Sequence, residues 1–308
     1  MSFPSLHIGD LVARTPIVQG GMGVGISLSG LASAVANEGG IGVIAGAMVG
    51  MREPDVASNP VEANIRALRR EIEKARAATQ GIIGVNVMVA LTTFAEMVKA
   101  AIESRADIVF SGAGLPMDLP KIFQETCEQK KEEFRTKLVP IVSSGRAIPV
   151  ITGGGVFSGA DIAKMLELGA SGVQMATRFV ATNECDADIR FKQAYVNARE
   201  EDVTIIHSPV GMPGRALNNS FIEAAREGRR KPFKCVFHCI KTCDPSTTPY
   251  CISSALINAM KGNLDKGFVF CGSNVARVKS IVSVHELVET LRREYDDFMA
   301  QKKEGCAV

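Results

Sequence analysis

The sequence contains no tryptophan, and aromatic residues make up only 6% of its 308 positions. Proteins that bind single-stranded nucleic acid stack bases on aromatic side chains, so this composition argues against such a surface. The net charge is only +2, because 35 basic residues nearly balance 33 acidic ones. Nucleic-acid and acidic-membrane partners depend on a strong basic charge, which this chain lacks. We therefore expect neither a nucleic acid nor a membrane as a partner.

Long uninterrupted apolar runs are also missing. The stretch 15–50 carries a single charged residue, Glu38, yet Gly, Pro, Gln, Ser and Asn interrupt it every few positions. A membrane-spanning helix needs about 20 consecutive apolar residues, so we expect this stretch to be buried inside a globular fold. The N-terminus has no basic start followed by an apolar core and does not resemble a secretory signal. These features predict a soluble cytoplasmic protein.

Glycine is abundant, with 29 residues, and apolar stretches alternate with amphipathic ones. Strands are expected at 16–19, 41–45, 82–89, 107–110, 138–142, 148–151 and 172–177. Helices are expected at 28–38, 61–80, 93–105, 118–134 and 160–168, and Ser27 is the expected N-cap of the first. This alternation indicates a parallel sheet with covered faces. Glycines and polar residues follow the strands and would collect at one rim, as in a (β/α)8 TIM barrel; an open doubly wound sheet is the alternative.

One junction breaks this pattern. Only five residues, 143–147, separate the strand expected at 138–142 from the one at 148–151. A parallel crossover needs about a dozen residues or more, so no helix fits between these two strands. Seven strands are expected in all, and a closed barrel needs an eighth. We therefore predict an α/β fold of the TIM-barrel type from which one βα segment is missing near residues 145–148.

Three consecutive glycines, Gly153, Gly154 and Gly155, follow the strand expected at 148–151. Ser158 then stands where the N-cap of the next helix is expected. Glycines allow backbone N–H groups to approach an anion closely, and a helix N-terminus adds a favourable dipole. In (β/α)8 barrels the loops after the last two strands commonly bind phosphate. The turn therefore indicates either a phosphate site or a tight turn of an ordinary α/β domain.

Five motifs occur in the order found in one enzyme family. They are Pro16–Met22 (PIVQGGM), Gly84–Met88 (GVNVM), Ser111–Gly114 (SGAG), Gly153–Gly155 (GGG) and Val173–Phe179 (VQMATRF). In these motifs the chain resembles the 2-nitropropane dioxygenase (nitronate monooxygenase) family, of which enoyl-ACP reductase II is a relative. The resemblance covers roughly residues 8–222. It implies an FMN-binding TIM barrel over residues 1–222, followed by a cysteine-rich and helical extension over 223–308 that packs on the barrel.

The resemblance also implies roles for individual residues. Gly20, Gly21 and Met22 would lie beside the isoalloxazine ring, and Asn86 and Gln174 would hydrogen-bond the flavin. The phosphate would be held by two segments, Gly153, Gly154 and Gly155 with Met175, Ala176 and Thr177. The family also carries an Ala-Gly-Gly-His element whose histidine is its proposed general base, and no Gly-Gly-His occurs in this sequence. The catalytic residue is therefore unknown, and His207, before a glycine-containing loop, is the best remaining imidazole.

Four cysteines gather in a short part of the extension. Cys235, Cys239, Cys243 and Cys251 lie within 17 residues, CVFHCIKTCDPSTTPYC. Four thiolates this close in the chain are able to reach one metal centre, and we favour an iron–sulfur cluster over zinc. The alternative is a helix whose buried thiols recur every four residues, because disulfides are rare in the cytoplasm.

Three functions are compatible with these features. The first is an FMN-dependent oxidoreductase that resembles nitronate monooxygenase and oxidises a small nitronate-like substrate with oxygen. The second is an NAD(P)H-dependent flavin reductase of enoyl thioesters, as in enoyl-ACP reductase II. The third is a flavin or iron–sulfur electron-transfer protein without chemistry of its own, which the missing histidine suggests. A homodimer is compatible with each of them.

We expect the natural polypeptide to be longer than this sequence, with extra residues between Gly145 and Ile148 that supply a strand and a histidine. Removing one strand from a closed barrel exposes two sheet edges, which makes a natural deletion costly. The intact mass of the purified protein is the measurement. A mass of 32.8 kDa, that of the present sequence, would show that the segment is naturally absent and would count against a catalytic role.

Overall fold

The computed structural model describes residues 3–130, 148–211, 213–229 and 233–305. Its centre is a parallel sheet of short strands rich in apolar residues, as the continuous apolar runs predict. These strands are β3 Ile17–Gln19, β4 Ile41–Ala45, β5 Ile82–Met88, β6 Ile108–Gly112, β7 Ile151–Gly153 and β8 Gly172–Met175. Their spatial order is β6-β5-β4-β3-β8-β7, which is the order of strands around a barrel.

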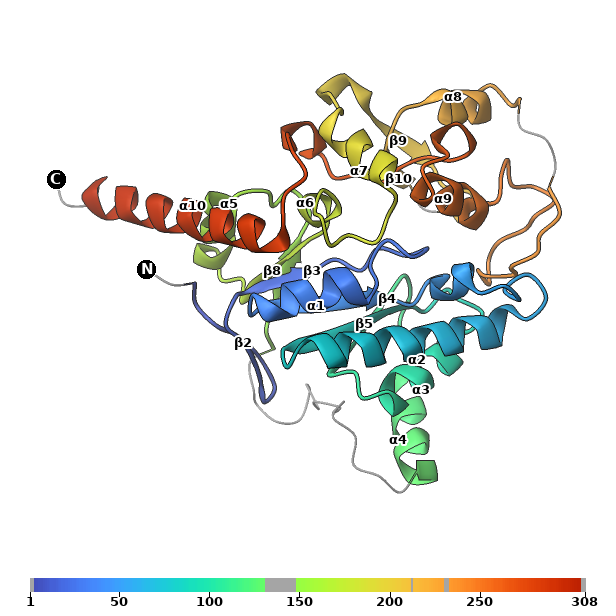
Figure 1. The fold of residues 1–308 in the computed structure, drawn as a ribbon, viewed down its shortest axis with the longest axis horizontal. Coiled ribbons are helices and arrows are strands. Elements are labelled where there is room, and N and C mark those ends of the chain that lie inside the picture. Colours follow the sequence, from blue (N-terminus) through green and yellow to red (C-terminus); the bar gives the residue numbers. More distant parts are fainter. Residues whose placement is uncertain (1–2, 131–147, 212, 230–232, 306–308) are drawn as a thin grey trace.

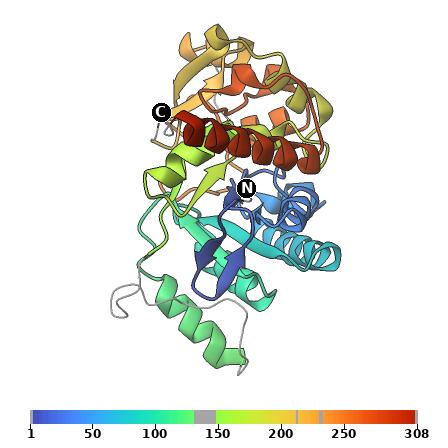
Figure 2. The same cartoon turned by 90° about the vertical axis from the view of Figure 1, so that its left-hand side faces the viewer.

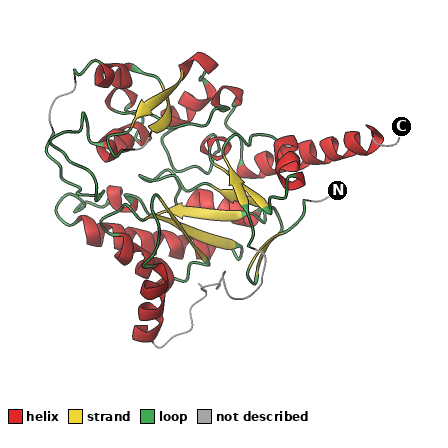
Figure 3. Ribbon diagram, turned by 180° about the vertical axis from the view of Figure 1, so that it is seen from behind, coloured by secondary structure: helices red, strands yellow, loops and turns green. Residues whose placement is uncertain are grey.

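The pairing of the last strand with the first gives this sheet its barrel character. In a (β/α)8 barrel the final strand returns to the first, and here β8 pairs with β3 in parallel. The sheet is curled, and α1, α2 and α3 lie together on one side of it (Figure 1 and Figure 3). Among the described residues, β6 and β7 are the two edges of this sheet. The fold is therefore TIM-barrel-like, and the described part of the ring is open between β6 and β7.

The N-terminal hairpin packs against the inner side chains of the sheet. It consists of β1 Leu6–Ile8 and β2 Leu11–Ala13, paired antiparallel. One apolar cluster joins Leu6 and Ala13 of the hairpin to Val18, Ile41 and Val43 of the strands. Strand side chains and a hairpin, rather than a layer of helices, therefore fill this region. That arrangement distinguishes the curled sheet from the open doubly wound alternative.

The helices that follow the strands are α1 Ser29–Asn37, α2 Pro60–Ala78, α3 Phe94–Glu103, α4 Leu119–Lys130 and α5 Gly159–Glu167. The apolar stripe of α2 includes Leu68 and Ile72, which are fully buried against the sheet and its neighbouring helices. The described part of α4 projects from the rest of the molecule in Figure 1 and Figure 2. None of the described helices is both long enough and apolar enough to cross a bilayer.

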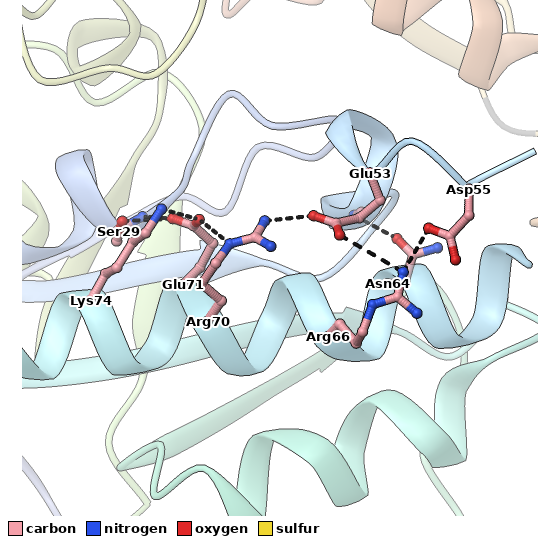
Figure 4. A network of polar contacts seen from close by, with 9 residues as sticks. Ser29, Glu53, Asp55, Asn64, Arg66, Arg70, Glu71 and Lys74 are labelled. Atoms are coloured by element: carbon pink, nitrogen blue, oxygen red, sulfur yellow. Dashed lines mark hydrogen bonds and ion pairs between the residues drawn. The ribbon is translucent and has the colours of Figure 1, made fainter.

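A row of ion pairs lies along α2 and links it to the preceding loop and to α1 (Figure 4). Arg70 pairs with Glu53 at 2.7 Å between nitrogen and oxygen. Glu71 is only 5% exposed; it accepts a hydrogen bond from the Ser29 hydroxyl at 2.6 Å and pairs with Lys74 at 3.1 Å. Exposed ion pairs contribute about 1 kcal/mol or less each. The apolar stripe therefore stabilises α2, and the polar row orients it.

The predicted elements lie within a few residues of their expected positions, with one exception. The strand predicted at 148–151 begins only at Ile151, and this prediction was wrong for Ile148 and Val150. Their side chains are 54% and 61% exposed, because they precede the point where β7 joins β8. The predicted strand 138–142, the end of the predicted helix 118–134 and the segment 143–147, on which the missing βα unit was inferred, lie outside the described residues.

The remaining elements form a second group on the opposite side of the sheet from α2 and α3 (Figure 1 and Figure 2). They include the antiparallel hairpin of β9 Val203–His207 and β10 Pro213–Leu217. The helices are α6 Thr177–Val180, α7 Ile189–Val196, α8 Ser220–Arg226, α9 Ile252–Met260 and α10 Val284–Gly305. Short 3-10 helices in this group are η2 Glu200–Asp202, η3 Leu264–Lys266 and η4 Val275–Arg277. A further 3-10 helix, η1 Val49–Arg52, packs against α2 instead.

The predicted division at residue 222 falls within α8. An apolar cluster also spans it, because Ile206 and Phe221 pack with Tyr250 and Phe268. α10 packs along α5, where the backbone N–H of Gly159 donates to Glu294 Oε2 at 2.8 Å. The separation into a barrel of residues 1–222 and an extension of residues 223–308 stays a prediction.

A glycine in β4 allows α1 to approach the sheet closely. A Cβ at Gly42 would lie 1.8 Å from the carbonyl oxygen of Ala32 in α1. We therefore expect Gly42→Ala to lower the free energy of unfolding by about 3 kcal/mol or more, since the helix must shift from the sheet. Gly112→Ala at the end of β6 is the matched control, because a Cβ there meets nothing within 4 Å. Urea unfolding followed by circular dichroism measures both; equal midpoints would contradict this account of the packing.

Candidate functional site

The pairing of β3 with β8 brings together two loops that are far apart in the sequence. Gln19 lies opposite Met175, and the backbone N–H of Gly20 donates to the Met175 carbonyl at 2.7 Å. The loop that begins at Gly20 therefore leaves the sheet beside the segment that begins at Met175. Both segments were predicted as binding residues from the family motifs, and the parallel register makes them neighbours.

The buried amide of Gln19 shapes the loop after β3. Its oxygen accepts from the backbone N–H of Val43 at 2.9 Å, and its nitrogen donates to the Ser27 hydroxyl at 2.7 Å. Ser27 also accepts from the backbone N–H of Met22 at 3.2 Å. The prediction of Ser27 as the N-cap of the next helix was wrong, because Leu28 is the N-cap and no side chain caps it. The hydroxyl closes the glycine loop instead.

The glycine turn forms an open concave segment after β7. Gly154 and Gly155 have φ of +90° and +77°, and a Cβ on either would project into open space. Such backbone angles strain other residues, so the turn depends on glycine. α5 follows directly, and Ser158 is its N-cap as predicted; its hydroxyl accepts from the backbone N–H of Asp161 at 3.2 Å. The turn therefore presents backbone, with no side chain in the way.

A cavity of about 1060 Å³ lies where these loops meet. Nine of the eleven residues predicted to contact a cofactor line it: Gly21, Met22, Gly153, Gly154, Gly155, Gln174, Met175, Ala176 and Thr177. Gly20 and Asn86 are not among its lining residues. Gly20 lies directly behind Ala176, and the Asn86 amide donates to the Phe110 carbonyl of the neighbouring strand at 3.3 Å. The predicted flavin contact of Asn86 is not tested by this arrangement.

A C-terminal segment that the motifs did not predict completes the cavity wall. Phe270, Cys271 and residues 272–274 line it. The Asn274 amide donates to the carbonyl of Gly155 at 2.7 Å, and the backbone N–H of Gly272 donates to the Thr177 hydroxyl at 2.9 Å. The extension thus holds both parts of the predicted phosphate site. The only sequence signal was the short Cys-Gly-Ser-Asn run, which carries no periodic pattern.

Among the described residues that line the cavity, none has a charged side chain and none is a histidine. Its titratable groups are Tyr195, Cys239 and Cys271. Burial raises the pKa of each of them, to about 11 for Cys271. The Tyr195 hydroxyl donates to the Phe270 carbonyl at 2.5 Å. These groups are therefore protonated at neutral pH and are weak bases. His207 is exposed at the end of β9 and does not line the cavity.

Two arginines stack on a phenylalanine behind the glycine turn. The guanidinium carbons of Arg178 and Arg277 lie 4.4 and 4.3 Å from the centre of the Phe157 ring. Burial lowers the pKa of Arg178, and the charge of Arg277 lowers it further while Glu294 opposes this. Arg277 also pairs with Asp161 at 3.7 Å between nitrogen and oxygen, and Glu294 acts on Arg178, so two carboxylates accompany the two cations.

The four clustered thiols lie on a loop across the rim of the cavity. The helical alternative was wrong, because residues 233–251 contain no helix and His238 has φ of +43°. Ile240 forms an antiparallel bridge with Leu91, and Cys239 lines the cavity. All seven described cysteines are free. Among the described residues, three potential ligand atoms come within 4.8 Å of one another only at Glu38, His285 and Glu289, which lie elsewhere on the surface.

Comparison with known proteins agrees with the resemblance seen in the motifs. The chain is 28% identical over 184 residues to a probable nitronate monooxygenase of Staphylococcus saprophyticus, covering 58% of this chain and 47% of the relative. The chain thus spans about half the length of that relative. It is also 28% identical over 241 residues to (3aS,4S,5R,7aS)-5-hydroxy-7a-methyl-1-oxo-octahydro-1H-indene-4-carboxyl-CoA dehydrogenase of Mycobacterium tuberculosis, covering 70% of this chain and 66% of that protein.

The fold is found in a solved structure as well. FabK from Thermotoga maritima superposes with a TM-score of 0.71 and 26% identity, over 94% of this chain and 95% of that one. The family profile described as nitronate monooxygenase matches residues 6–122 and 123–294, which together include nearly the whole chain. The chain therefore belongs to the nitronate monooxygenase family.

Proposed function

We propose that this protein is an FMN-dependent oxidoreductase that oxidises small nitronate-like substrates with oxygen. The observation that carries the proposal is that the glycine turn and residues of two other family motifs line one cavity. These residues are Gly21 and Met22 of the first motif and Gln174, Met175, Ala176 and Thr177 of the last. Family membership supports the same activity. The chain spans about half the length of the nitronate monooxygenase relative from Staphylococcus saprophyticus, so the activity of the whole relative is a proposal for this chain.

The residues present fit FMN. Ligand cavities commonly enclose about 300–1,000 Å³, so a cavity of about 1060 Å³ has room for a cofactor together with a small substrate. The open turn at Gly154 and Gly155 would admit a phosphate to backbone N–H groups. Gly21, Met22 and Gln174 would contact the ring system, and Thr177 would lie at the phosphate end.

Bound FMN would supply the acceptor for the electrons that leave the substrate carbon. The chain's own residues position the cofactor and exclude water, since Met22, Met48, Met88, Leu91 and Ile240 give the cavity an apolar lining. The described lining residues do not offer a base, because none of them is a carboxylate or an imidazole and their thiols and phenol are protonated. A substrate that is already deprotonated suits such a cavity. A nitronate meets this condition, whereas a neutral nitroalkane does not.

The second candidate is NAD(P)H-dependent reduction of an enoyl thioester. It is favoured by the similarity to a dehydrogenase whose printed name specifies a carboxyl-CoA thioester. Oxidation of NADH in the presence of a crotonyl thioester would discriminate this activity from nitronate oxidation. A third candidate, flavin or iron–sulfur electron transfer without substrate chemistry, would be favoured if flavin-loaded protein turned over none of these substrates.

Further partners follow from these candidates. The four clustered thiols are proposed ligands of an iron–sulfur or zinc centre, and NAD(P)H would enter only with the second candidate. A cytoplasmic location is supported by the seven free cysteines, since disulfides form mainly in oxidising compartments. A homodimer is compatible with the proposed activity.

The glycine turn can be tested with one added carboxylate. We expect Gly154→Asp to weaken FMN binding about a thousandfold, because a like charge about 4 Å from the phosphate costs about 4 kcal/mol. Gly169→Asp is the matched control: it also has positive φ, of +97°, and open space around a Cβ, but does not line the cavity. Fluorescence titration with FMN measures both. Equal affinities, or binding of FAD in preference to FMN, would refute the assignment of the phosphate site.

The lack of a base among the described lining residues predicts a substrate preference. We expect oxygen consumption with propyl-2-nitronate to exceed that with freshly dissolved neutral 2-nitropropane by about 100-fold or more, since a positioned base contributes about that factor or more. An oxygen electrode at pH 7 measures both rates on flavin-loaded protein. Equal rates would show that the protein itself removes the proton. No oxygen uptake with either compound would count against the proposed activity.

A further inference from the structure

The C-terminal segment 271–278 contacts both parts of the proposed phosphate site. The Asn274 amide donates to the Gly155 carbonyl at 2.7 Å. The backbone N–H of Gly272 donates to the Thr177 hydroxyl at 2.9 Å. Two residues of one short segment thus hold the turn that follows β7 and the residue that begins α6 after β8. The placement of the glycine turn relative to Thr177 therefore depends on this segment.

The segment itself is anchored in the core. Val275 is fully buried and belongs to the apolar cluster that contains Met175 of β8. The backbone N–H of Cys271 donates to the carbonyl of Arg215 in β10 at 3.0 Å. Asn274 is the N-cap residue of η4, a position where an asparagine side chain commonly caps its own helix, but here it makes no capping bond. Its amide serves the glycine turn instead.

The N–H groups at the start of α5 are already engaged. Those of residues 157–159 donate to the carboxylates of Asp161 and Glu294 at 2.8 to 3.1 Å. Among the described residues, neither the N–H of Gly155 nor that of Val156 donates to a protein acceptor. Both residues line the cavity. An anion at the turn would therefore use the N–H groups of the turn, because those of the helix are occupied.

The Asn274 contact sets the direction of one of these N–H groups. The peptide bond between Gly155 and Val156 is trans, so its carbonyl and its N–H lie in one plane and point in opposite directions. A donor that holds the Gly155 carbonyl therefore also holds the Val156 N–H. Glycine has the greatest backbone freedom of all residues, so the turn needs such a contact to keep one orientation. A donor held in place before binding loses less entropy when the ligand arrives.

We propose that Asn274 is a positioning residue for the phosphate of the bound cofactor. Its amide holds the Gly155–Val156 peptide so that the Val156 N–H is available to the phosphate, and it acts through the backbone of the turn. This inference rests on the proposed binding of FMN. It goes beyond that proposal because Asn274 lies outside every family motif, in a segment that the sequence patterns did not connect with the turn.

Paired titrations with FMN and riboflavin test this role, because riboflavin has the same ring system without the phosphate. We expect Asn274→Ala to weaken FMN binding about fivefold, through the loss of one hydrogen bond, and riboflavin binding less than about twofold. Asn258→Ala in α9 is the matched control. The Asn258 amide also donates to a backbone carbonyl, that of Ser254 at 2.9 Å, but Asn258 does not line the cavity. Its replacement should leave both affinities unchanged.

Two results would overturn the role. One is equal weakening of FMN and riboflavin, which a purely structural contact predicts, and the other is equal FMN affinity in Asn274→Ala and Asn258→Ala. Circular dichroism verifies the fold, and Asn274→Leu, of similar volume, replaces Asn274→Ala if that variant does not fold. If riboflavin binds too weakly to titrate, the phosphorus NMR shift of bound FMN takes its place. An unchanged shift in Asn274→Ala would then overturn the role.

Failure of the proposed function would look different. An unaltered chain that binds no FMN would contradict the flavin assignment, and the role of Asn274 with it. Binding of FMN that Gly154→Asp abolishes and Asn274→Ala leaves intact would contradict only the role of Asn274.

Discussion

The parallel pairing of β3 with β8 is the interaction on which the rest of the site depends. It sets Gln19 opposite Met175 and thereby places the loop after β3 beside the segment that ends at Thr177. The fully buried Gln19 amide adds β4 to the same register through the backbone of Val43. Three strands are thus aligned by a few hydrogen bonds. A one-residue slip would turn the lining residues of β8 to the opposite face.

The described wall of the cavity carries little charge. Its residues contribute glycine backbone, methionines, aliphatic and aromatic side chains, and a few hydroxyls, amides and thiols, and none of them is a carboxylate, a basic side chain or an imidazole. In such surroundings backbone N–H groups would bind an anion, while titratable groups stay protonated. The site is suited to holding a cofactor and excluding water. It is poorly suited to removing a proton from carbon.

The C-terminal part of the chain belongs to the same site. Asn274 donates a hydrogen bond to Gly155 of the glycine turn, and Gly272 donates one to Thr177. The loop of residues 235–251 lies at the rim, where Ile240 forms a bridge with Leu91. The segment that carries Gly272 and Asn274 is also held by apolar packing, since Val269 and Val275 are buried in the cluster that contains Met175, and Phe268 packs with residues of β9, α8 and α9. Polar and apolar contacts therefore hold this part of the wall together. Changes in the extension are expected to alter the cavity without altering the sheet.

Local patterns in the sequence determined the strands, the helices and the glycine turn. Continuous apolar runs and helical spacing are properties of neighbouring residues, and the Ser158 cap needs only residues within α5 and its start. The same reasoning failed at Ser27, whose hydroxyl serves Gln19 and Met22, and at Ile148, where the sheet partner begins three residues later. In both cases a distant partner competed with a local signal.

The family motifs in the sequence also predicted which residues would gather, and nine of the eleven line one cavity. Only the tertiary structure decided that Phe270, Cys271 and Asn274 complete its wall, and that the four thiols lie on a loop instead of a helix. The physical reason is that these contacts join residues far apart in the chain. Such contacts leave no periodicity, because each depends on where the fold carries two separate segments.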